Sequence, residues 1–156
     1  MGHGRIIGID YGRKRVGLAM SDPLAFFARP LGAFEPSAAL EELMRVHAHE
    51  GIERLVVGWP LLPDGSVGES ARQVSHFIRR LEKRFPGVEV IRWNEEYTTE
   101  HAKDLIAAGG KPSLRSSGRG RLDAAAAGVI LQEYLDDVRR KSDGPVDASS
   151  NQAGSE

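Results

Sequence analysis

The chain has 156 residues, and at roughly 100–200 residues per domain this length predicts a single domain with a core of its own. Its 22 acidic and 21 basic side chains leave a net charge of −1, and it contains no cysteine. The missing cysteine excludes disulfides, thiolate catalysis and cysteine-based zinc sites. No apolar run reaches the roughly 18 residues that a membrane span requires, so we expect a soluble, cytoplasmic protein.

The first part of the chain predicts a three-strand antiparallel meander. Residues 5–10 (RIIGID) form a short β-branched run that is typical of a buried strand. Residues 16–21 (VGLAMS) follow after the turn at residues 12–15, so the two runs predict a hairpin. Residues 26–34 predict a third strand, although its proline and glycine weaken the pattern.

The next part alternates helices with strands. A helix that follows Pro36, with Ser37 as its cap, precedes a buried strand at residues 53–58. Its predicted apolar face consists of Leu40, Leu43, Met44 and His47. A second helix, with a capping box formed by Ser66 and Glu69, precedes a strand at residues 88–93.

Two further helices complete the predicted pattern. One begins at Thr98 or Thr99 and ends at residues 109–110, and the last spans residues 123–140. The apolar stripe of this last helix consists of Ala127, Ile130, Leu131, Tyr134, Leu135 and Val138. A strand meander followed by alternating helices and strands predicts an α/β fold, in which a mixed five-stranded sheet carries two parallel strands and helices on its faces.

The segment 142–156 differs in composition from the rest. It has three acids, no base and almost no large apolar residue, so it buries too little surface to offset its ordering entropy. We therefore expect a folded domain at residues 1–141 and a disordered acidic and polar tail at residues 142–156. Without the tail the chain has 21 basic and 19 acidic side chains, which permits nucleic-acid binding without arguing for it.

Three carboxylates stand at positions where a site is expected. Asp10 ends the first predicted strand, where a charge either binds a metal or caps the following turn. Glu95 follows the last predicted strand, and sites in open α/β sheets gather at the carboxyl ends of strands, although a solvated loop glutamate is the commoner case. Asp123 opens the last helix in line with its apolar stripe, or simply caps it.

One chemical role would explain all three acids. Carboxylate oxygens are hard ligands that suit Mg²⁺ or Mn²⁺, and clustered acids stay ionised together only beside a cation. Two such ions about 3.5–4 Å apart activate a water and stabilise the leaving oxygen of a phosphodiester. The acids lie 85 and 28 residues apart in the sequence, so only the fold could bring them together.

Two basic segments adjoin these acids in the sequence. The predicted turn after Asp10 carries Arg13 and Lys14, and a loop without acids that leads to Asp123 carries Lys111, Arg115, Arg119 and Arg121. Basic side chains of this kind contact phosphates and position a strand without reading its sequence. A solvated loop remains the alternative interpretation for both segments.

Four stretches in order resemble a known family. GIDYGRKRVGLAMSD, LVVGWPLLPDGSVGESARQ, WNEEYTT and GRLDAAAAGVILQEYLD are similar to YqgF/RuvX-like proteins, and the resemblance covers roughly residues 5–140. Proteins of this family are also described as Holliday-junction resolvase homologues and as pre-16S ribosomal RNA nucleases. The resemblance implies a ribonuclease H-like fold and a metal-dependent nuclease activity.

The resemblance also implies a role for each acid. The Asp-x-Gly of the family matches Asp10, its second acid aligns with Glu95, and its third acid, before an alanine-rich helix, matches Asp123. This sequence departs from the family at Asn94 and Glu96, where the family has Asp-Glu-Arg around the second acid. The role of that arginine is therefore in doubt here.

Two other side chains near these motifs have open interpretations. Trp59 stands where the family has a smaller apolar residue, and it either stacks on a base or covers the core. His101 follows the threonine pair and could carry a proton.

These observations predict a two-metal-ion endonuclease that binds Mg²⁺ or Mn²⁺ through Asp10, Glu95 and Asp123. The resemblance favours RNA and the 5′ end of pre-16S ribosomal RNA, in ribosome biogenesis, with the protein acting as a monomer or homodimer away from membranes. The alternatives are a resolvase of branched DNA, which needs a symmetric pair of sites, and a degenerate nucleic-acid-binding module. A sugar-kinase or actin-type ATPase is disfavoured because those folds use two related domains, whereas this chain predicts one.

Overall fold

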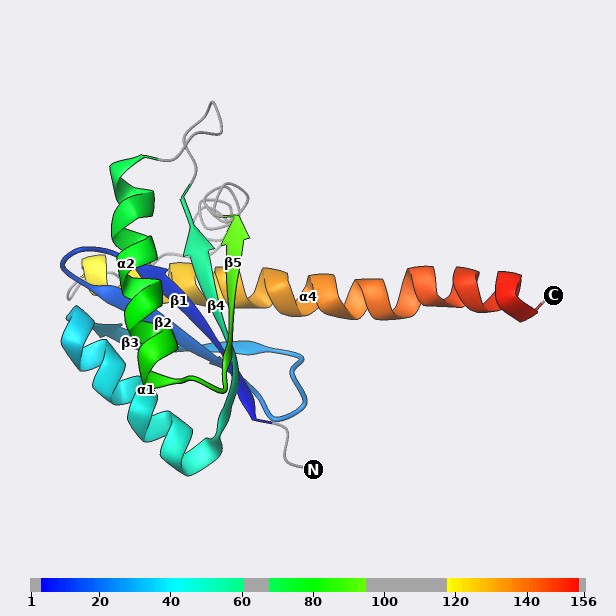
Figure 1. Ribbon diagram of the computed structural model, residues 1–156, viewed down its shortest axis with the longest axis horizontal. Helices are drawn as coiled ribbons and strands as arrows, with labels where there is room; N and C mark the ends of the chain where they lie inside the picture. Colours follow the sequence, from blue (N-terminus) through cyan, green and yellow to red (C-terminus); the bar gives the residue numbers. More distant parts are fainter. Residues whose placement is uncertain (1–3, 61–67, 95–117, 155–156) are drawn as a thin grey trace.

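Five strands and three helices make up the described part of the computed structural model, which covers residues 4–60, 68–94 and 118–154 (Figure 1). The strands are β1 (Arg5–Tyr11), β2 (Val16–Ser21), β3 (Ala28–Phe34), β4 (Ile52–Trp59) and β5 (Glu89–Asn94). The helices are α1 (Pro36–Glu50), α2 (Glu69–Arg84) and α4 (Gly118–Gly154). The helix predicted after Thr98 or Thr99 lies outside the described residues.

The strands form one mixed sheet in the order β3-β2-β1-β4-β5. Strand β2 pairs antiparallel with both β1 and β3, while β4 pairs parallel with both β1 and β5. This topology confirms the predicted meander with two added parallel strands. Because β1, β4 and β5 run in the same direction, their carboxyl ends meet at one edge of the sheet.

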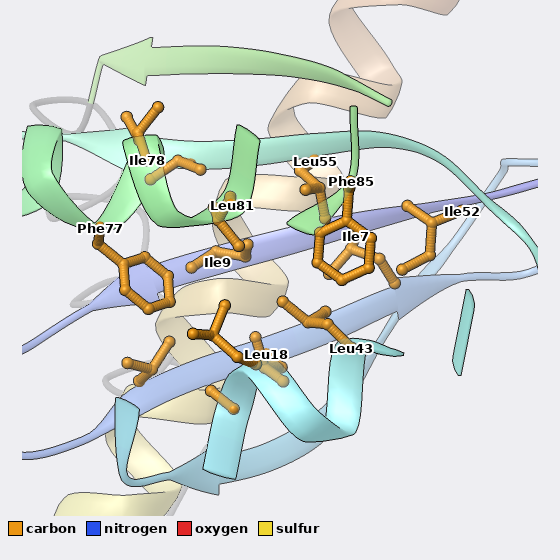
Figure 2. Packing of buried hydrophobic residues seen from close by; sticks show 14 of the residues in the cluster. Ile7, Ile9, Leu18, Leu43, Ile52, Leu55, Phe77, Ile78, Leu81 and Phe85 are labelled. Atoms are coloured by element: carbon orange, nitrogen blue, oxygen red, sulfur yellow. The ribbon is translucent and has the colours of Figure 1, made fainter. Parts of the chain in front are cut away.

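The two faces of the sheet carry different helices, and alternation along β1 shows which side chain faces which helix. Ile7 and Ile9 belong to the core that α1 and α2 cover, and Figure 2 shows them packed with Leu43 and Phe77. Ile6 belongs to the second core, on the face that α4 crosses in Figure 1. This second core consists of Ile6, Ala19, Val56, Ala127, Ile130, Leu131, Tyr134 and Leu135.

Helix α4 passes very close to β1 at Gly8. A Cβ built on Gly8 would lie 2.7 Å from the carbonyl oxygen of Ala127 and 2.7 Å from the Cβ of Leu131. Only a residue without a side chain fits between the strand and the helix at this crossing. The buried stripe of α4 confirms the predicted positions as far as Leu135, whereas Val138 is 40% exposed.

The helix starts differ from the sequence-based predictions. Helix α1 begins at Pro36 with Glu35 as the residue before it, so Ser37 lies inside the first turn rather than at the cap. Proline suits the first helical position because it lacks the N–H that would stay unpaired there. Helix α2 begins at Glu69 itself, preceded by Gly68, so Glu69 does not occupy the third helical position that a capping box requires.

The buried face of α1 also differs from the prediction. Met44 is 45% exposed and His47 is exposed, while the buried positions are Ala39, Leu40, Leu43 and Val46. His47 instead accepts a hydrogen bond at its Nδ1 from the backbone N–H of Ile52, at 2.9 Å. The helix is therefore turned so that small Ala39 faces the sheet, and His47 stabilises the connection to β4.

Helix α4 continues beyond the predicted end of the folded domain. Disorder is predicted for residues 142–156, whereas the backbone of α4 stays helical through Gly154 and projects away from the sheet (Figure 1). The segment contains Gly144 and Pro145, which are the weakest helix formers, so its intrinsic propensity does not account for this continuation. The division of the chain at residue 141 stays a prediction. Within the described residues, no helix combines the length and the apolar character needed to cross a bilayer.

Candidate functional site

Asp10 is the candidate acid whose side chain the structure describes. It is the penultimate residue of β1, is partly buried, and pairs across the hairpin with Gly17. Since strand side chains alternate, Asp10 faces the same side of the sheet as Ile6 and Gly8, which is the side that α4 covers. The strand therefore delivers a carboxylate to its carboxyl end on the α4 face.

The direction of α4 determines which end of the helix lies near Asp10. Ala127 meets β1 at Gly8. About two turns after Ala127, the hydroxyl of Tyr134 accepts a hydrogen bond at 3.0 Å from Arg54. The register partner of Arg54 on β1 is Ile6. Helix α4 thus runs toward the amino end of β1, and its first turns lie toward the carboxyl end, where Asp10 stands.

The backbone of Asp123 falls at the level of Asp10. Asp123 lies four residues before Ala127, a rise of about 6 Å along the helix. Asp10 lies two residues after Gly8, about 7 Å along the strand. Both positions are therefore displaced by similar distances, in the same direction, from the Gly8–Ala127 contact. The side chain of Asp123 lies outside the described part of the structure.

Glu95 lies outside the described residues, and the structure gives the end of the strand before it. Strand β5 ends at Asn94, which pairs with Trp59 at the end of β4. The register of β1 with β4 pairs Ile9 with Val57, so the last residues of β1, β4 and β5 lie at the same sheet edge. The chain reaches Glu95 one residue beyond this edge.

The described side chains alone do not form a metal site. Within residues whose side chains are described, no group of three or more histidine, cysteine, aspartate or glutamate residues could hold a metal ion. Of the predicted ligand set, these described side chains include that of Asp10 but not those of Glu95 and Asp123. Three carboxylates would give a hard, oxygen-only donor set, and this chemistry fits Mg²⁺ or Mn²⁺.

The basic turn lies at the same edge as Asp10. Arg13 and Lys14 are exposed in the hairpin turn between β1 and β2, directly beyond the pair formed by Tyr11 and Val16. Of the second basic segment, Lys111 and Arg115 lie outside the described residues. The backbones of Arg119 and Arg121 belong to the first turns of α4, and their side chains are not described.

Trp59 and Arg92 form a contact at this edge that sequence reasoning did not identify. Trp59 ends β4 and packs against the core on the α1–α2 face, which favours the core-covering interpretation. The guanidinium carbon of Arg92, an exposed residue of β5, lies 4.8 Å from the centre of the Trp59 ring, a cation–π contact. Alternation along VEVIRW could have placed Arg92 on the face of Val90. His101 lies outside the described residues.

The order of the strands and the parallel additions to the meander define a ribonuclease H-like fold. A solved structure described as T. thermophilus RuvC in complex with Holliday junction substrate has the same fold, with a TM-score of 0.52 and 15% identity over 85% of this chain and 94% of that chain.

The chain belongs to the RuvX family. The family model, described as Holliday junction resolvase, matches residues 4–137. A protein of Salinibacter ruber is 45% identical over 131 residues, which cover 84% of this chain and 92% of the relative. A protein of Chlorobaculum tepidum is 42% identical over 134 residues, covering 86% and 94%. Both relatives carry the name "Putative pre-16S rRNA nuclease". These matches confirm the resemblance that the four sequence stretches indicate.

Proposed function

We propose that this chain is a nuclease that hydrolyses phosphodiester bonds in nucleic acid with the help of Mg²⁺ or Mn²⁺. The observation that carries the proposal is the position of Asp10. Its carboxylate stands at the carboxyl edge of the sheet, on the face where the first turns of α4 bring the backbone of Asp123 to the same level. Membership of the RuvX family supports the same activity.

Asp10, Glu95 and Asp123 would hold the cations. Three carboxylates gathered at one edge repel one another, so each keeps its charge only when a cation compensates them. When bound, the divalent ions supply activation of a water and neutralisation of charge on the leaving oxygen. The protein's own contribution would be placement, because Asp10 and Asp123 belong to two rigid elements, β1 and α4.

The exposed hairpin turn would position the substrate. Arg13 and Lys14 lie beyond the end of β1 with no ion pair among the described residues. A phosphate backbone that passes the acids would therefore meet cations that are available for it. The second basic segment, which leads to Asp123, would add further phosphate contacts through Lys111, Arg115, Arg119 and Arg121.

The substrate that we propose is RNA, at the 5′ end of pre-16S ribosomal RNA. The names of the relatives from Salinibacter ruber and Chlorobaculum tepidum support this substrate. A chain with this role would act in ribosome biogenesis.

A second candidate function is the resolution of branched DNA. The description of the matching family supports it. Resolution cuts two strands symmetrically and so needs two sites that face one junction. Cleavage of a four-way DNA junction, compared with cleavage of an RNA that contains the 16S 5′ end, separates the two substrates.

The direct test is Asp10→Asn, with Glu82→Gln as the control. Glu82 is an exposed acid of α2, so the control removes a charge of the same sign away from the edge. We expect cleavage of the RNA in Mn²⁺ to fall by at least ~10³-fold in Asp10→Asn, with an unchanged circular dichroism spectrum, and to stay at the wild-type level in Glu82→Gln. Full activity in Asp10→Asn would refute the proposed site.

Calorimetric titration with Mn²⁺ distinguishes a nuclease from a degenerate module. A nuclease binds the metal, and Asp10→Asn weakens that binding. A chain that binds RNA but takes up no metal would instead be a nucleic-acid-binding module.

A further inference from the structure

The loop between β2 and β3 exposes large apolar side chains at the edge of the sheet opposite Asp10. Leu24 is 74% exposed, Phe27 is 70% exposed and Phe26 is 42% exposed, and Val138 of α4, nearby, is 40% exposed. A single exposed apolar residue needs no explanation, but a cluster of this size marks an interaction site. We call these four residues the apolar patch.

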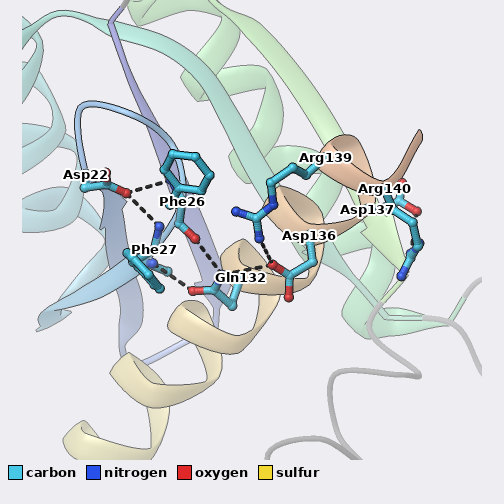
Figure 3. A network of polar contacts seen from close by, with 9 residues as sticks. Asp22, Phe26, Phe27, Gln132, Asp136, Asp137, Arg139 and Arg140 are labelled. Atoms are coloured by element: carbon cyan, nitrogen blue, oxygen red, sulfur yellow. Dashed lines mark hydrogen bonds and ion pairs between the residues drawn. The ribbon is translucent and has the colours of Figure 1, made fainter. Parts of the chain in front are cut away.

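Hydrogen bonds fix the conformation of this loop. The carboxylate of Asp22 accepts hydrogen bonds from the backbone N–H groups of Phe26 and Phe27, at 2.8 and 2.6 Å (Figure 3). It also accepts one from the N–H of Leu24, at 3.1 Å. The loop also contains Ala25 with a φ of 61°, a left-handed conformation that costs energy for a residue with a side chain. The loop therefore holds a specific shape while its apolar side chains stay in water.

Helix α4 fastens the same loop from its other side. The side-chain amide of Gln132 accepts a hydrogen bond from the N–H of Ala28 and donates one to the carbonyl oxygen of Phe26, both at 2.9 Å. The guanidinium carbon of Arg139 lies 5.0 Å from the centre of the Phe26 ring. A loop ordered in advance loses little entropy when it binds, which favours docking.

A groove of about 450 Å³ is lined in part by Leu24, Phe26 and Val138 of the apolar patch. Its lining includes Gly4 just before β1, Ile6 of β1, and Leu135 of α4. Phe27 projects next to this groove and is not part of its lining. One surface thus carries both a projecting aromatic ring and an apolar recess that is large enough for a ring.

We propose that the occupant of this groove is the β2–β3 loop of a second copy of the chain, in a two-fold symmetric dimer. In such a dimer Phe27 of each copy enters the groove of the other, because both features belong to the same surface. The charged residues that line the groove are compatible with this arrangement. Glu53, which forms an ion pair with Arg54, and Arg139, which forms one with Asp136, line the groove from β4 and α4. In this dimer the acid of one copy would lie opposite the base of the other.

The area of the apolar patch fits a weak dimer. At roughly 200 Å² for a fully exposed large side chain, its four residues present on the order of 400 Å². Two patches then bury on the order of 800 Å², and the rim brings the total toward the lower limit of specific interfaces, about 1,200 Å². We therefore expect weak self-association that depends on concentration.

This dimer directs the two candidate nuclease sites away from each other. Ile6, near the start of β1, lines the groove, whereas Asp10 stands at the opposite end of the same strand. Each copy would then act on its own substrate strand, and the pair would not present two sites to one junction. Association through the apolar patch needs neither metal nor nucleic acid, so it is tested separately from the nuclease activity.

Sedimentation velocity of the full chain, from about 1 to 200 μM without metal or nucleic acid, tests the proposal. We expect a concentration-dependent monomer–dimer equilibrium, and a dissociation constant at least tenfold higher for Phe27→Ser and for Leu24→Ser. Met44→Ser is the control, since Met44 is an exposed apolar residue of α1, outside the apolar patch, and this variant should associate as the wild type does. Urea unfolding verifies that each variant is folded. A wild type that stays monomeric at 200 μM, or a Phe27→Ser variant that dimerises normally, would overturn the proposal.

Charge reversal tests the pairing across the two-fold axis. Glu53→Lys and Arg139→Glu should each weaken self-association, because each places like charges opposite one another. An equimolar mixture of the two variants restores opposite charges at both contacts and should associate at least as tightly as the wild type. A mixture that associates no better than either variant alone would show that Glu53 and Arg139 do not meet across the interface, and would overturn this geometry.

Discussion

Replacing Gly8 by alanine tests how closely α4 must approach β1 for the candidate site to form. The added Cβ would lie 2.7 Å from both the carbonyl oxygen of Ala127 and the Cβ of Leu131. Carbon atoms in contact normally lie about 3.5–4.0 Å apart, so the helix would have to retreat by about 1 Å. No rotamer change relieves the contact, because the opposing atoms belong to the backbone of α4 and to the first atom of a side chain.

The size of the effect follows from this contact. Overpacking of a core costs about 1–3 kcal/mol, and two contacts of this kind put the change at the upper end. Alanine restricts the unfolded chain more than glycine does, which offsets about 0.5–1 kcal/mol. We therefore expect the free energy of unfolding to fall by about 2 kcal/mol, a decrease in Tm of about 4–8 °C for a chain of this size.

The same retreat should affect catalysis. Moving α4 away from β1 moves the backbone of Asp123 away from Asp10, and a misplacement of about 1 Å at a site costs on the order of 10²-fold in rate. Urea unfolding measures the first effect, and RNA cleavage in Mn²⁺, at a temperature where the variant is folded, measures the second. A Gly8→Ala variant that is as stable and as active as the wild type would refute the close approach. A variant that is destabilised but fully active would refute its role in placing the acids.

Gly128→Ala is the matched control on the same helix. A Cβ at Gly128 would lie 3.6 Å from Cγ of Pro30, an ordinary van der Waals contact. Alanine is favoured over glycine inside a helix by about 1 kcal/mol. We therefore expect this variant to be slightly more stable than the wild type and to keep its activity.

Three further predictions concern other parts of the chain. The N–H of Phe27, above all other donors, holds the pKa of Asp22 below its ordinary value. The stabilisation that Asp22 gives the loop is therefore complete at neutral pH, above the ordinary pKa of about 3.9, and is lost as the pH falls through the lower folded-state value. Protection of the loop amides against hydrogen exchange, measured relative to the intrinsic exchange rate at each pH, should fall below pH 4 in the wild type and should not change with pH in Asp22→Asn. Wild-type protection that stays constant across this pH range would contradict the prediction. Leu131→Ala empties a fully buried position of α4 and should cost about 3 kcal/mol by urea unfolding, whereas a loss below ~1 kcal/mol would mean that α4 does not need its packing on the sheet. The double change Arg13→Ala and Lys14→Ala should lower the slope of log K against log salt for single-stranded RNA by about 1.4, measured by fluorescence anisotropy in Ca²⁺, and an unchanged slope would exclude the turn from phosphate contact.

The sequence predicted the sheet because the signals for its strands are local. Runs such as RIIGID and RLVVG are β-branched and lie between breakers, so their strands were identified almost to the residue. Alternation along β1 then places Asp10 on one face of the sheet. The same reasoning failed for α1, because Met44 and Val46 are both apolar and only the fit of Ala39 against the sheet decides which of them is buried.

Features that depend on distant parts of the chain were not predictable. The contact of Gly8 with Ala127 joins residues more than a hundred positions apart, and no local sequence pattern predicts it. The sequence around Phe26 and Phe27 resembles the beginning of a strand. Their exposure depends on the hydrogen bonds that their backbone makes with the side chains of Asp22 and Gln132. Of the candidate site, the sequence predicted Asp10 and its edge, whereas the stacking of Arg92 on Trp59 required the register of β4 with β5.

Helix α4 extends on both sides of its crossing at Gly8, with arms of unequal length. From Ala127 the helix extends about 6 Å back to Asp123 and about 18 Å forward to Arg139. If α4 tilts as a rigid rod about this crossing, the level of Arg139 moves about three times as far as the level of Asp123. The end of α4 that carries Asp123 is therefore displaced least. Substitutions near Arg139 that tilt the helix during evolution would change the positions of the acids least.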